Sequence, residues 1–190
     1  MDEKREELLK LIREKSVRFG DFTLSSGKKS SYYIDARLTT LDPKGAYLIG
    51  NLILDRLKDS GISADAVGGL SLGADPISTA VSLMSFVRNE PLRALLVRRE
   101  TKRHGMGRRV EGELTRGDAV IVVEDVISTG GSTLTAIEAI EAEGAHVAAV
   151  VGLVDRLMGG KESLEAKGYK VDVIFTIKEI LGERWKSPED

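Results

Sequence analysis

The residues best suited to chemistry lie in one stretch in the middle of the chain, from Val120 to Thr133. Two acids, Glu124 and Asp125, follow a run of apolar residues that is typical of a strand buried in a sheet. A turn rich in hydroxyl groups and glycine comes next, and a helix is expected from about Gly131. Unpaired backbone N–H groups at such a turn attract anions, and glycine lets a phosphate approach the backbone closely. The pattern therefore predicts a phosphate site.

The two carboxylates need a different partner, because like charges repel and Glu124 and Asp125 cannot hold the phosphate themselves. They suit the hydroxyl groups of a sugar, or a positive charge that develops on it. A phosphate beside two such carboxylates indicates a ribose 5-phosphate. The segment is not a P-loop, because no Gly-Lys-Ser/Thr follows its glycines, and it is not a dinucleotide fingerprint. The alternative is an ordinary strand-to-helix turn with an acidic strand end.

A dense run of positive charge lies between Arg98 and Arg109, with Glu100 as its only acid. Gly105 and Gly107 interrupt it, and it lacks apolar periodicity. Such a segment suits a mobile lid over a highly charged anion. The alternatives are a solvated basic face and a nucleic-acid patch. Because the segment carries no aromatic residue and the chain has a net charge of −2, we expect no nucleic-acid partner.

The segment VIVVEDVISTGGST resembles the motif with which type I phosphoribosyltransferases bind phosphoribosyl pyrophosphate (PRPP). The resemblance implies that Glu124 and Asp125 hold the ribose hydroxyls, that Asp125 is also catalytic, and that the loop at 126–133 holds the 5-phosphate. It assigns PRPP contacts to Glu124, Asp125, Val126, Ile127, Ser128, Thr129, Gly130, Gly131 and Ser132.

The order R-R-E-T-K-R-H-G, starting at Arg98, resembles the catalytic loop of orotate phosphoribosyltransferases. It implies that Arg98, Arg99, Lys102 and His104 contact PRPP, and that Lys102 and His104 act catalytically at the pyrophosphate. Arg99 stands where a Lys is commoner in the family, and an Arg fork differs in geometry from an ammonium group. In that family the loop closes over the active site of the partner subunit, which implies a homodimer.

The segment FTLSSGKKSSYYIDAR is similar to the N-terminal hood of the same family. The similarity assigns Tyr33 and Ile34 to the orotate pocket. Ser25 stands where the family often has Lys, and Lys28 or Lys29 could compensate for it. The alternative for the tyrosines is simple hairpin packing.

Arg156 follows a buried strand and could pair bidentately with a planar carboxylate. In the family this Arg binds the carboxylate of orotate, and Ser128 also contacts the base. The alternative is a structural ion pair between Asp155 and Arg156. The segment GGLSLGADP looks like the pyrophosphate loop of the family, and backbone amides would bind there because Leu70 to Ala74 offers no basic side chain. Its alternative is a glycine turn.

Taken together, the resemblances imply a glycosyltransferase that joins orotate to the ribose 5-phosphate of PRPP. The products would be orotidine 5'-monophosphate, an intermediate of pyrimidine biosynthesis, and pyrophosphate. Mg²⁺ would be carried mainly by PRPP oxygens and waters, and we see no set of metal ligands in the protein. The alternatives are a phosphoribosyltransferase for another base and a non-catalytic regulator that senses PRPP.

These segments need a scaffold, and the apolar pattern predicts one. Strands are expected at 65–69, 92–97, 119–123, 146–154 and 171–176, and helices at 76–88, 131–143 and 177–181. An amphipathic helix and a hairpin precede a helix that Asp42 caps and that stops near Gly61. The alternation predicts an α/β fold of the type I phosphoribosyltransferase kind, with a parallel sheet, helices on both faces and a small N-terminal hood.

The length of 190 residues predicts a single domain, with the N-terminal helix and hood over about 1–40 and the α/β core over about 41–190. The absence of cysteine excludes disulfides, thiolate metal sites and cysteine nucleophiles. The longest apolar stretch, Val147 to Val154, is far shorter than the roughly 20 residues that span a bilayer. We therefore expect a soluble, cytoplasmic protein without a membrane partner.

Overall fold

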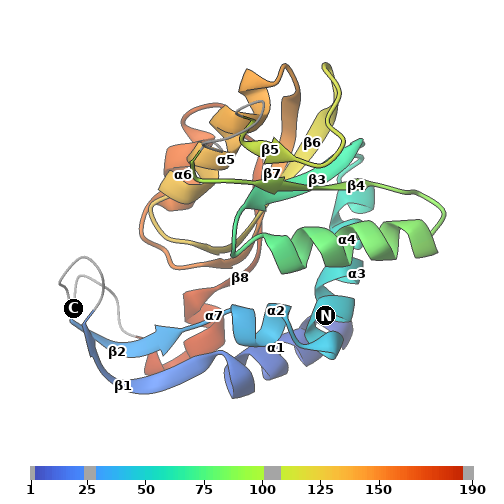
Figure 1. The fold of residues 1–190 in the computed structure, drawn as a ribbon. Coiled ribbons are helices and arrows are strands. Elements are labelled where there is room, and N and C mark those ends of the chain that lie inside the picture. Colours follow the sequence, from blue (N-terminus) through green and yellow to red (C-terminus); the bar gives the residue numbers. More distant parts are fainter. Residues whose placement is uncertain (1–2, 24–28, 101–107, 186–190) are drawn as a thin grey trace.

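The computed structural model describes residues 3–23, 29–100 and 108–185 (Figure 1). Its core is a six-stranded sheet with the strand order β5-β4-β3-β6-β7-β8. Neighbouring strands run parallel except β4 and β5, which are antiparallel. The strands are β3 (Ala66–Leu70), β4 (Arg93–Val97), β5 (Val110–Glu111), β6 (Ala119–Ile127), β7 (His146–Asp155) and β8 (Val171–Thr176). The predicted parallel α/β sheet is confirmed.

Helices cover both faces of this sheet, as predicted (Figure 1). One face carries α3 (Pro43–Asp59) and α4 (Asp75–Val87), and the other carries α5 (Gly131–Ala142) and α6 (Gly160–Glu165). The strand β6 supplies both cores, because Ile121 and Val123 belong to the cluster of α3 and α4, whereas Val120 and Val122 belong to that of α5. All four side chains are fully buried, which explains why this strand has no polar face.

A small second sheet pairs β1 (Val17–Thr23) with β2 (Lys29–Ile34) in antiparallel fashion, which confirms the predicted hairpin. The helices α1 (Glu3–Lys15), α2 (Arg37–Thr40) and α7 (Ile177–Leu181) lie beside it at the bottom of Figure 1, and the turn η1 (Gly182–Arg184) follows α7. The guanidinium of Arg5 donates to the carbonyl of Ile174, and that of Arg13 to the carbonyl of Ile180. The hood is therefore built from both ends of the chain.

Local signals place most helices and strands to within one or two residues. Asp42 caps α3, since its Oδ1 accepts hydrogen bonds from the backbone N–H groups of Lys44 at 3.0 Å and Gly45 at 3.1 Å. Beyond the end of this helix, Gly61 adopts a φ of +65°, as expected of a glycine that stops a helix. The predicted bounds of β8 and α7 are confirmed without change.

Several features of the fold differ from the prediction. The short helices α2 and α6 and the edge strand β5 were not predicted, and β6 continues to Ile127 instead of ending at Val123. Glu124 and Asp125 therefore lie within a strand, whereas the sequence pattern placed them after it. None of the helices in the described part of the chain combines the length and the apolar character needed to cross a membrane.

Candidate active site

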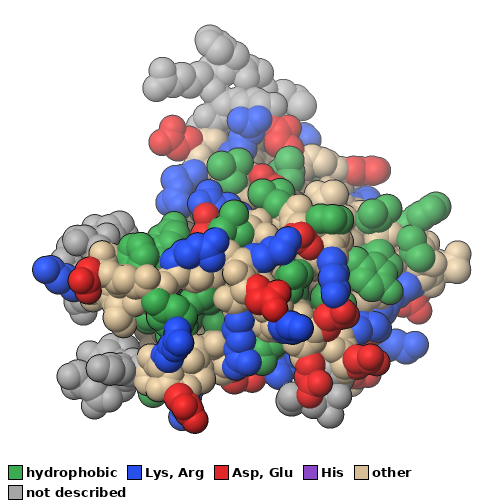
Figure 2. Space-filling view, turned by 90° about the horizontal axis from the view of Figure 1, so that it is seen from below, with side chains coloured by type: hydrophobic (Ala, Val, Ile, Leu, Met, Phe, Trp, Pro, Cys, Tyr) green, Lys and Arg blue, Asp and Glu red, His purple; other side chains and the backbone are tan. Residues whose placement is uncertain are grey.

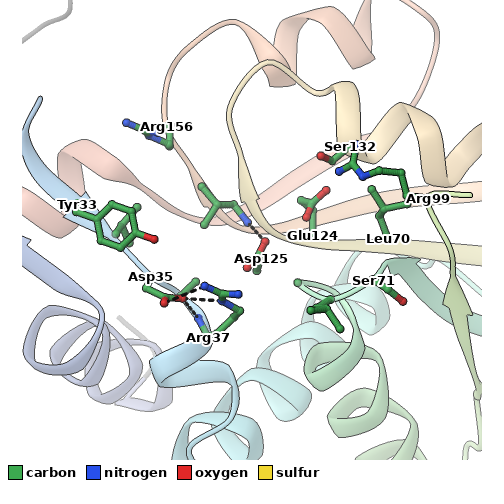
Figure 3. A pocket seen from close by; sticks show the side chains of 15 residues that line it. Tyr33, Asp35, Arg37, Leu70, Ser71, Arg99, Glu124, Asp125, Ser132 and Arg156 are labelled. Carbon is green, nitrogen blue, oxygen red and sulfur yellow. Dashed lines mark hydrogen bonds and ion pairs between the residues drawn. The ribbon is translucent and has the colours of Figure 1, made fainter. Parts of the chain in front are cut away.

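A pocket of about 360 Å³ lies at the carboxyl ends of β3 and β6, which are neighbours in the centre of the sheet (Figure 3). After β3 the chain continues to β4 on one side of this pair of strands, and after β6 it continues to β7 on the other side. Open α/β sheets bind ligands where the loops diverge in this way. The lining comes from the end of the hood at 33–37, the loop at 70–73, Arg99, the acidic pair with Val126 and Ser132, and Arg156.

The acidic pair lies on β6, and the alternation of a strand sends its two side chains to opposite faces of the sheet. Glu124 is only 5% exposed, and its Oε2 accepts a hydrogen bond from Thr133 Oγ1 at 3.2 Å. Asp125 is partly exposed in the pocket, where its Oδ1 accepts a hydrogen bond from the backbone N–H of Val126 at 2.8 Å. The two neighbours in sequence thus have different surroundings.

Their electrostatic states differ as well. Burial, with the neighbouring negative charge of Asp125 as the second cause, raises the pKa of Glu124 to about 8. Without a ligand, Glu124 is therefore mostly protonated at pH 7, and its carboxyl group can donate a hydrogen bond as well as accept one, which suits a sugar hydroxyl.

The loop after β6 encloses a smaller cavity of about 90 Å³, lined by Glu124 and by residues 126–133. This is about three times the volume that one molecule occupies in liquid water, at roughly 30 Å³. Gly130 is the N-cap residue of α5 and has a φ of +81°, a conformation that favours glycine. Glycine has no side chain that could cap the helix, so the first N–H groups of α5, which belong to residues lining the cavity, have no side-chain cap. The predicted PRPP residues from Glu124 and from Val126 to Ser132 are brought together here.

Arg156 and the hood form another wall of the pocket. The guanidinium carbon of Arg156 lies 5.7 Å from the centre of the Tyr32 ring. Its Nε is buried and has no hydrogen-bond partner among the described residues. The alternative prediction, an ion pair with Asp155, is not formed within this part of the chain. Asp155 is 1% exposed, and its Oδ1 accepts a hydrogen bond from the backbone N–H of Leu157 at 2.8 Å. A buried donor without a partner suits an acceptor that a ligand brings.

The other residues that were predicted to bind the base line two different cavities. Tyr33 and Ile34 line the large pocket, as predicted, and the ring of Tyr33 lies 5.7 Å from that of Phe22. Ser128 lines the small cavity and is absent from the lining of the large one. The structure therefore groups Ser128 with the phosphate loop and Tyr33 with Arg156.

The basic residues that were predicted to contact PRPP do not all line the pocket. Arg99 lines the pocket and lies beside Ser132 in Figure 3. Arg98 points elsewhere, because its Nε donates to Glu111 Oε1 at 2.9 Å. Its backbone N–H also donates to the carbonyl of Arg109 at 2.8 Å, which joins the two ends of the basic segment. Lys102 and His104 lie outside the described residues, as do Ser25 and Lys28.

The loop after β3, which resembles a pyrophosphate loop, borders the acidic pair directly. A Cβ atom at Gly73 would lie 2.5 Å from Asp125 Oδ1, so only glycine permits this approach. Ser71 holds the loop in place, since its Oγ donates to Asp75 Oδ1 at 2.9 Å and its backbone N–H donates to the carbonyl of Val97. Leu72 is 72% exposed. The loop contributes backbone but no basic side chain, as predicted from its sequence.

Two charged residues of the pocket, Asp35 and Arg37, were not predicted. They follow β2 directly. Arg37 donates to Asp35 through Nε at 2.9 Å and through Nη2 at 3.1 Å, and these hydrogen bonds lower the pKa of Asp35. The signal in the sequence was an acid and a base two residues apart, immediately after the pocket-lining Tyr33 and Ile34.

Comparisons with known proteins agree with this geometry. Residues 50–186 match the phosphoribosyl transferase domain family. The orotate phosphoribosyltransferase of Rhodopirellula baltica is 44% identical over 177 residues, covering 91% of this chain and 92% of the relative. That of Pyrococcus furiosus is 42% identical over 178 residues, covering 93% and 95%.

Solved structures extend the likeness to three dimensions. The orotate phosphoribosyltransferase of Mycobacterium tuberculosis in complex with Fe(III) dicitrate has a TM-score of 0.83 at 40% identity, covering 93% of this chain and 98% of that one. The same enzyme in complex with PRPP has a TM-score of 0.79 at 35% identity, with the same coverage. The described site and these matches, which cover hood and core alike, show that the chain belongs to the phosphoribosyl transferase domain family and, within it, to the orotate phosphoribosyltransferases.

Proposed function

We propose that this chain joins orotate to the ribose 5-phosphate of PRPP and releases pyrophosphate. One observation carries the proposal. Two cavities that share Glu124, Val126 and Ser132 bring together a helix N-terminus suited to phosphate, an acidic pair suited to ribose, and the Nε of Arg156, which has no hydrogen-bond partner among the described residues. Each of these features matches one part of the two substrates. The family of the chain supports the same activity.

The pocket suggests a division of labour in binding. The N–H groups and hydroxyls of 126–133 would hold the 5-phosphate. Asp125 would accept hydrogen bonds from the ribose hydroxyls, and the protonated Glu124 could donate one. Arg156 would hold the orotate carboxylate, with Tyr33 beside the ring. The base is thus selected by a charge, because orotate carries a carboxylate that uracil and the purines lack.

In the reaction, N1 of orotate loses its proton to a pyrophosphate oxygen or to water and forms a bond to the anomeric carbon of the ribose. The bond from that carbon to the pyrophosphate oxygen breaks, and pyrophosphate takes the electron pair. Positive charge develops on the ribose in the transition state, where the carboxylate of Asp125 lies in the pocket to stabilise it. Lys102 and His104 remain our candidates for stabilising the pyrophosphate charge, and closure of the site would exclude water.

We also propose a requirement for Mg²⁺. No three His, Asp or Glu side chains gather into a metal site within the described residues. Mg²⁺ in phosphate chemistry is commonly bound by one or two carboxylates together with substrate phosphates and waters, and Asp125 beside Glu124 fits that mode. When bound with PRPP, Mg²⁺ would neutralise part of the pyrophosphate charge.

An exposed apolar surface supports a homodimer. Large hydrophobic side chains are exposed on α2, α3 and α4, namely Leu38, Leu41, Tyr47, Leu83, Phe86 and Val87. Figure 2 shows hydrophobic side chains gathered on the right of the face seen from below, the side on which α3 and α4 extend in Figure 1. Large apolar side chains gathered on an exposed surface commonly mark an interface between proteins. We propose that a second copy of the chain covers it.

A test of subunit mixing addresses both the dimer and the basic loop. We expect the loop to act on the partner's active site, so that Lys102→Ala and Asp125→Asn homodimers are each nearly inactive. Mixing them with subunit exchange would place both intact residues at one site of each heterodimer. Equal amounts give about half heterodimers, so activity should approach about a quarter of wild type if the sites are independent. No recovery after proven exchange would show that the loop acts on its own subunit.

One assay tests the activity itself. The loss of orotate absorbance with PRPP and Mg²⁺ should be compared with turnover of adenine, hypoxanthine and uracil. Turnover of orotate alone supports the proposal, turnover of a purine instead would indicate a phosphoribosyltransferase for another base, and PRPP binding without turnover would indicate a regulator. A chelator should abolish turnover but leave the thermal midpoint of the ligand-free protein unchanged. A large drop in that midpoint would indicate a structural metal.

A further inference from the structure

Arg37 lines the pocket, but the binding roles proposed above assign it to no group of either substrate. Three arginines line the pocket, namely Arg37, Arg99 and Arg156. In Figure 3, Arg99 lies beside Ser132 of the phosphate loop, and Arg156 lies on the hood side above Tyr33. Arg37 lies in neither place. It lies below Asp125, between the hood and the loop that carries Ser71.

The shape of PRPP relates this position to the pyrophosphate. This step rests on the proposed function, in which the 5-phosphate occupies the cavity at 126–133 and the ribose lies against Asp125. The pyrophosphate is attached at C1 of the ribose and the phosphate at C5, so the two groups lie at opposite ends of the molecule. In Figure 3, Ser132 of the phosphate loop lies above Asp125, whereas Arg37 and Ser71 lie below it, on the side away from the phosphate loop.

That loop brings no positive charge to this end of the pocket. Its side chains are Ser71 and Leu72, followed by Gly73. The hydroxyl of Ser71 already donates to Asp75, which leaves mainly backbone N–H groups for a ligand. Pyrophosphate carries several negative charges and gains another as it leaves, so a cation beside it stabilises both the bound and the departing group. Arg37 brings a positive charge to this part of the pocket.

The ion pair with Asp35 holds the guanidinium in the orientation that this role needs. Nε and Nη2 donate to the two oxygens of Asp35, so one edge of the planar group is occupied. Within the described chain Nη1 has no hydrogen-bond partner, and the edge formed by Nη1 and Nη2 remains for a ligand. Two N–H groups on one edge match two oxygens of a phosphate.

We propose that Arg37 binds the pyrophosphate group of PRPP and stabilises it as it leaves, and that Asp35 is the positioning residue of that guanidinium. Arg37 is thereby a further substrate-binding residue, one that compensates for the missing basic side chain of the loop at 71–73.

Binding calorimetry with three probes, each in the presence of Mg²⁺, tests this proposal. The probes are pyrophosphate itself, ribose 5-phosphate, which has no pyrophosphate group, and PRPP, which contains the ribose 5-phosphate and the pyrophosphate. Arg37→Gln should weaken pyrophosphate and PRPP binding by about 10- to 100-fold, the scale of losing hydrogen bonds to a charged group. Binding of ribose 5-phosphate should change less than about twofold.

Arg56→Gln is the matched control, because Arg56 also pairs with an aspartate, Asp172, but does not line the pocket. It should leave all three affinities unchanged. Unchanged pyrophosphate binding in Arg37→Gln would overturn the proposal. An equal loss for ribose 5-phosphate would overturn it too, because Arg37 would then support the pocket as a whole.

The positioning role of Asp35 is tested by measuring pyrophosphate binding in Asp35 variants. Asp35→Asn should weaken pyrophosphate binding less than Arg37→Gln does, because the cation remains. In the Arg37→Gln background, Asp35→Asn should instead strengthen binding, since it removes a negative charge that no longer has a partner. Weaker binding in both backgrounds would overturn the positioning role. Wild-type turnover of orotate, measured in parallel, tests the proposed function separately, because the pyrophosphate comparison does not depend on orotate.

Discussion

The phosphate loop and the base-binding wall belong to one active site, but they are constructed in different ways. The phosphate loop is a single segment at 126–133, between a buried strand and the helix that it starts. Its binding groups are backbone N–H groups and hydroxyls. The base-binding wall joins Tyr33, from the hood, to Arg156, which follows β7. In the proposed function its selectivity depends on Arg156, whose Nε has no hydrogen-bond partner among the described residues.

The difference shows which kind of site tolerates change. A site made of backbone survives many side-chain substitutions but depends on glycines and on close packing. A site made of one side chain loses its ligand when that side chain is removed. The first kind of site is therefore expected to be common to phosphoribosyltransferases in general, and the second to distinguish one base from another. Four predictions test this contrast.

The largest effect is expected at the base-binding wall. Arg156→Ala should lower the apparent affinity for orotate by about 2–5 kcal/mol, the usual result of removing half of a buried charge pair, and change PRPP binding little. Steady-state kinetics with each substrate varied in turn measures both. Arg156→Lys, which keeps the charge but not the fork, should lie in between. An equal loss for both substrates would show that Arg156 is a structural residue of the pocket.

The next effect concerns the residue between the two regions. Asp125→Asn should lower kcat/KM for PRPP by roughly 100-fold or more, the scale of losing one preorganised electrostatic group. The fold should survive, because the side chain is partly exposed at the end of the sheet. Asp172→Asn, outside the pocket, serves as the control for a general loss of charge. Activity close to wild type in Asp125→Asn would disprove the ribose site.

The third prediction concerns the packing of the phosphate loop. A Cβ atom at Gly160 would lie 2.5 Å from the carbonyl oxygen of Ser128 and 2.7 Å from the backbone nitrogen of Gly130. Gly160→Ala should therefore shift the loop and destabilise the protein by about 1–3 kcal/mol, the usual cost of overpacking. Thermal unfolding of the ligand-free protein measures it. Gly131→Ala is the control, because its Cβ would meet nothing closer than 4.0 Å. If both variants unfold at the wild-type temperature, the loop does not depend on α6.

The last prediction is a dependence of stability on pH. The pKa of Glu124 rises from its ordinary 4.5 to about 8 on folding, so the folded state keeps a proton that the unfolded state has lost between these values. The contribution of this group to stability therefore falls as pH rises through that window. Glu124→Gln removes the effect. The variant should be more stable than wild type at pH 9, by at least about 1 kcal/mol, and equal to it near pH 4.

The measurement is thermal unfolding of both ligand-free proteins across this range. A difference that does not change with pH would mean that Glu124 is already ionised in the empty pocket. A difference that grows with pH would support the raised pKa of Glu124. That pKa depends on the burial of Glu124 in the folded protein and not on the sequence motif alone.

The sequence by itself determined the elements that depend on near neighbours. Asp42 with Pro43 predicted the start of α3, and the alternation of strands and helices predicted the parallel sheet. The phosphate loop could be located because a buried strand, a glycine turn and a helix start are contiguous in the chain. Such signals act over a few residues, so they can be seen without knowing the fold. The resemblance to a family then supplied the assignment of these residues to PRPP.

Only the tertiary structure decided how distant residues meet. Packing of the hood against the sheet brings Arg37 and Asp35 into the pocket, although the residues beside them in the sequence do not show which part of a ligand they face. Burial against α5 raises the pKa of Glu124, which the position of this residue beside Asp125 in the chain does not reveal. Asp155 accepts a hydrogen bond from the backbone N–H of Leu157, and the Nε of Arg156 has no hydrogen-bond partner within the described part of the chain. Charge, burial and the choice of partner depend on segments that are far apart in sequence, so local patterns cannot predict them.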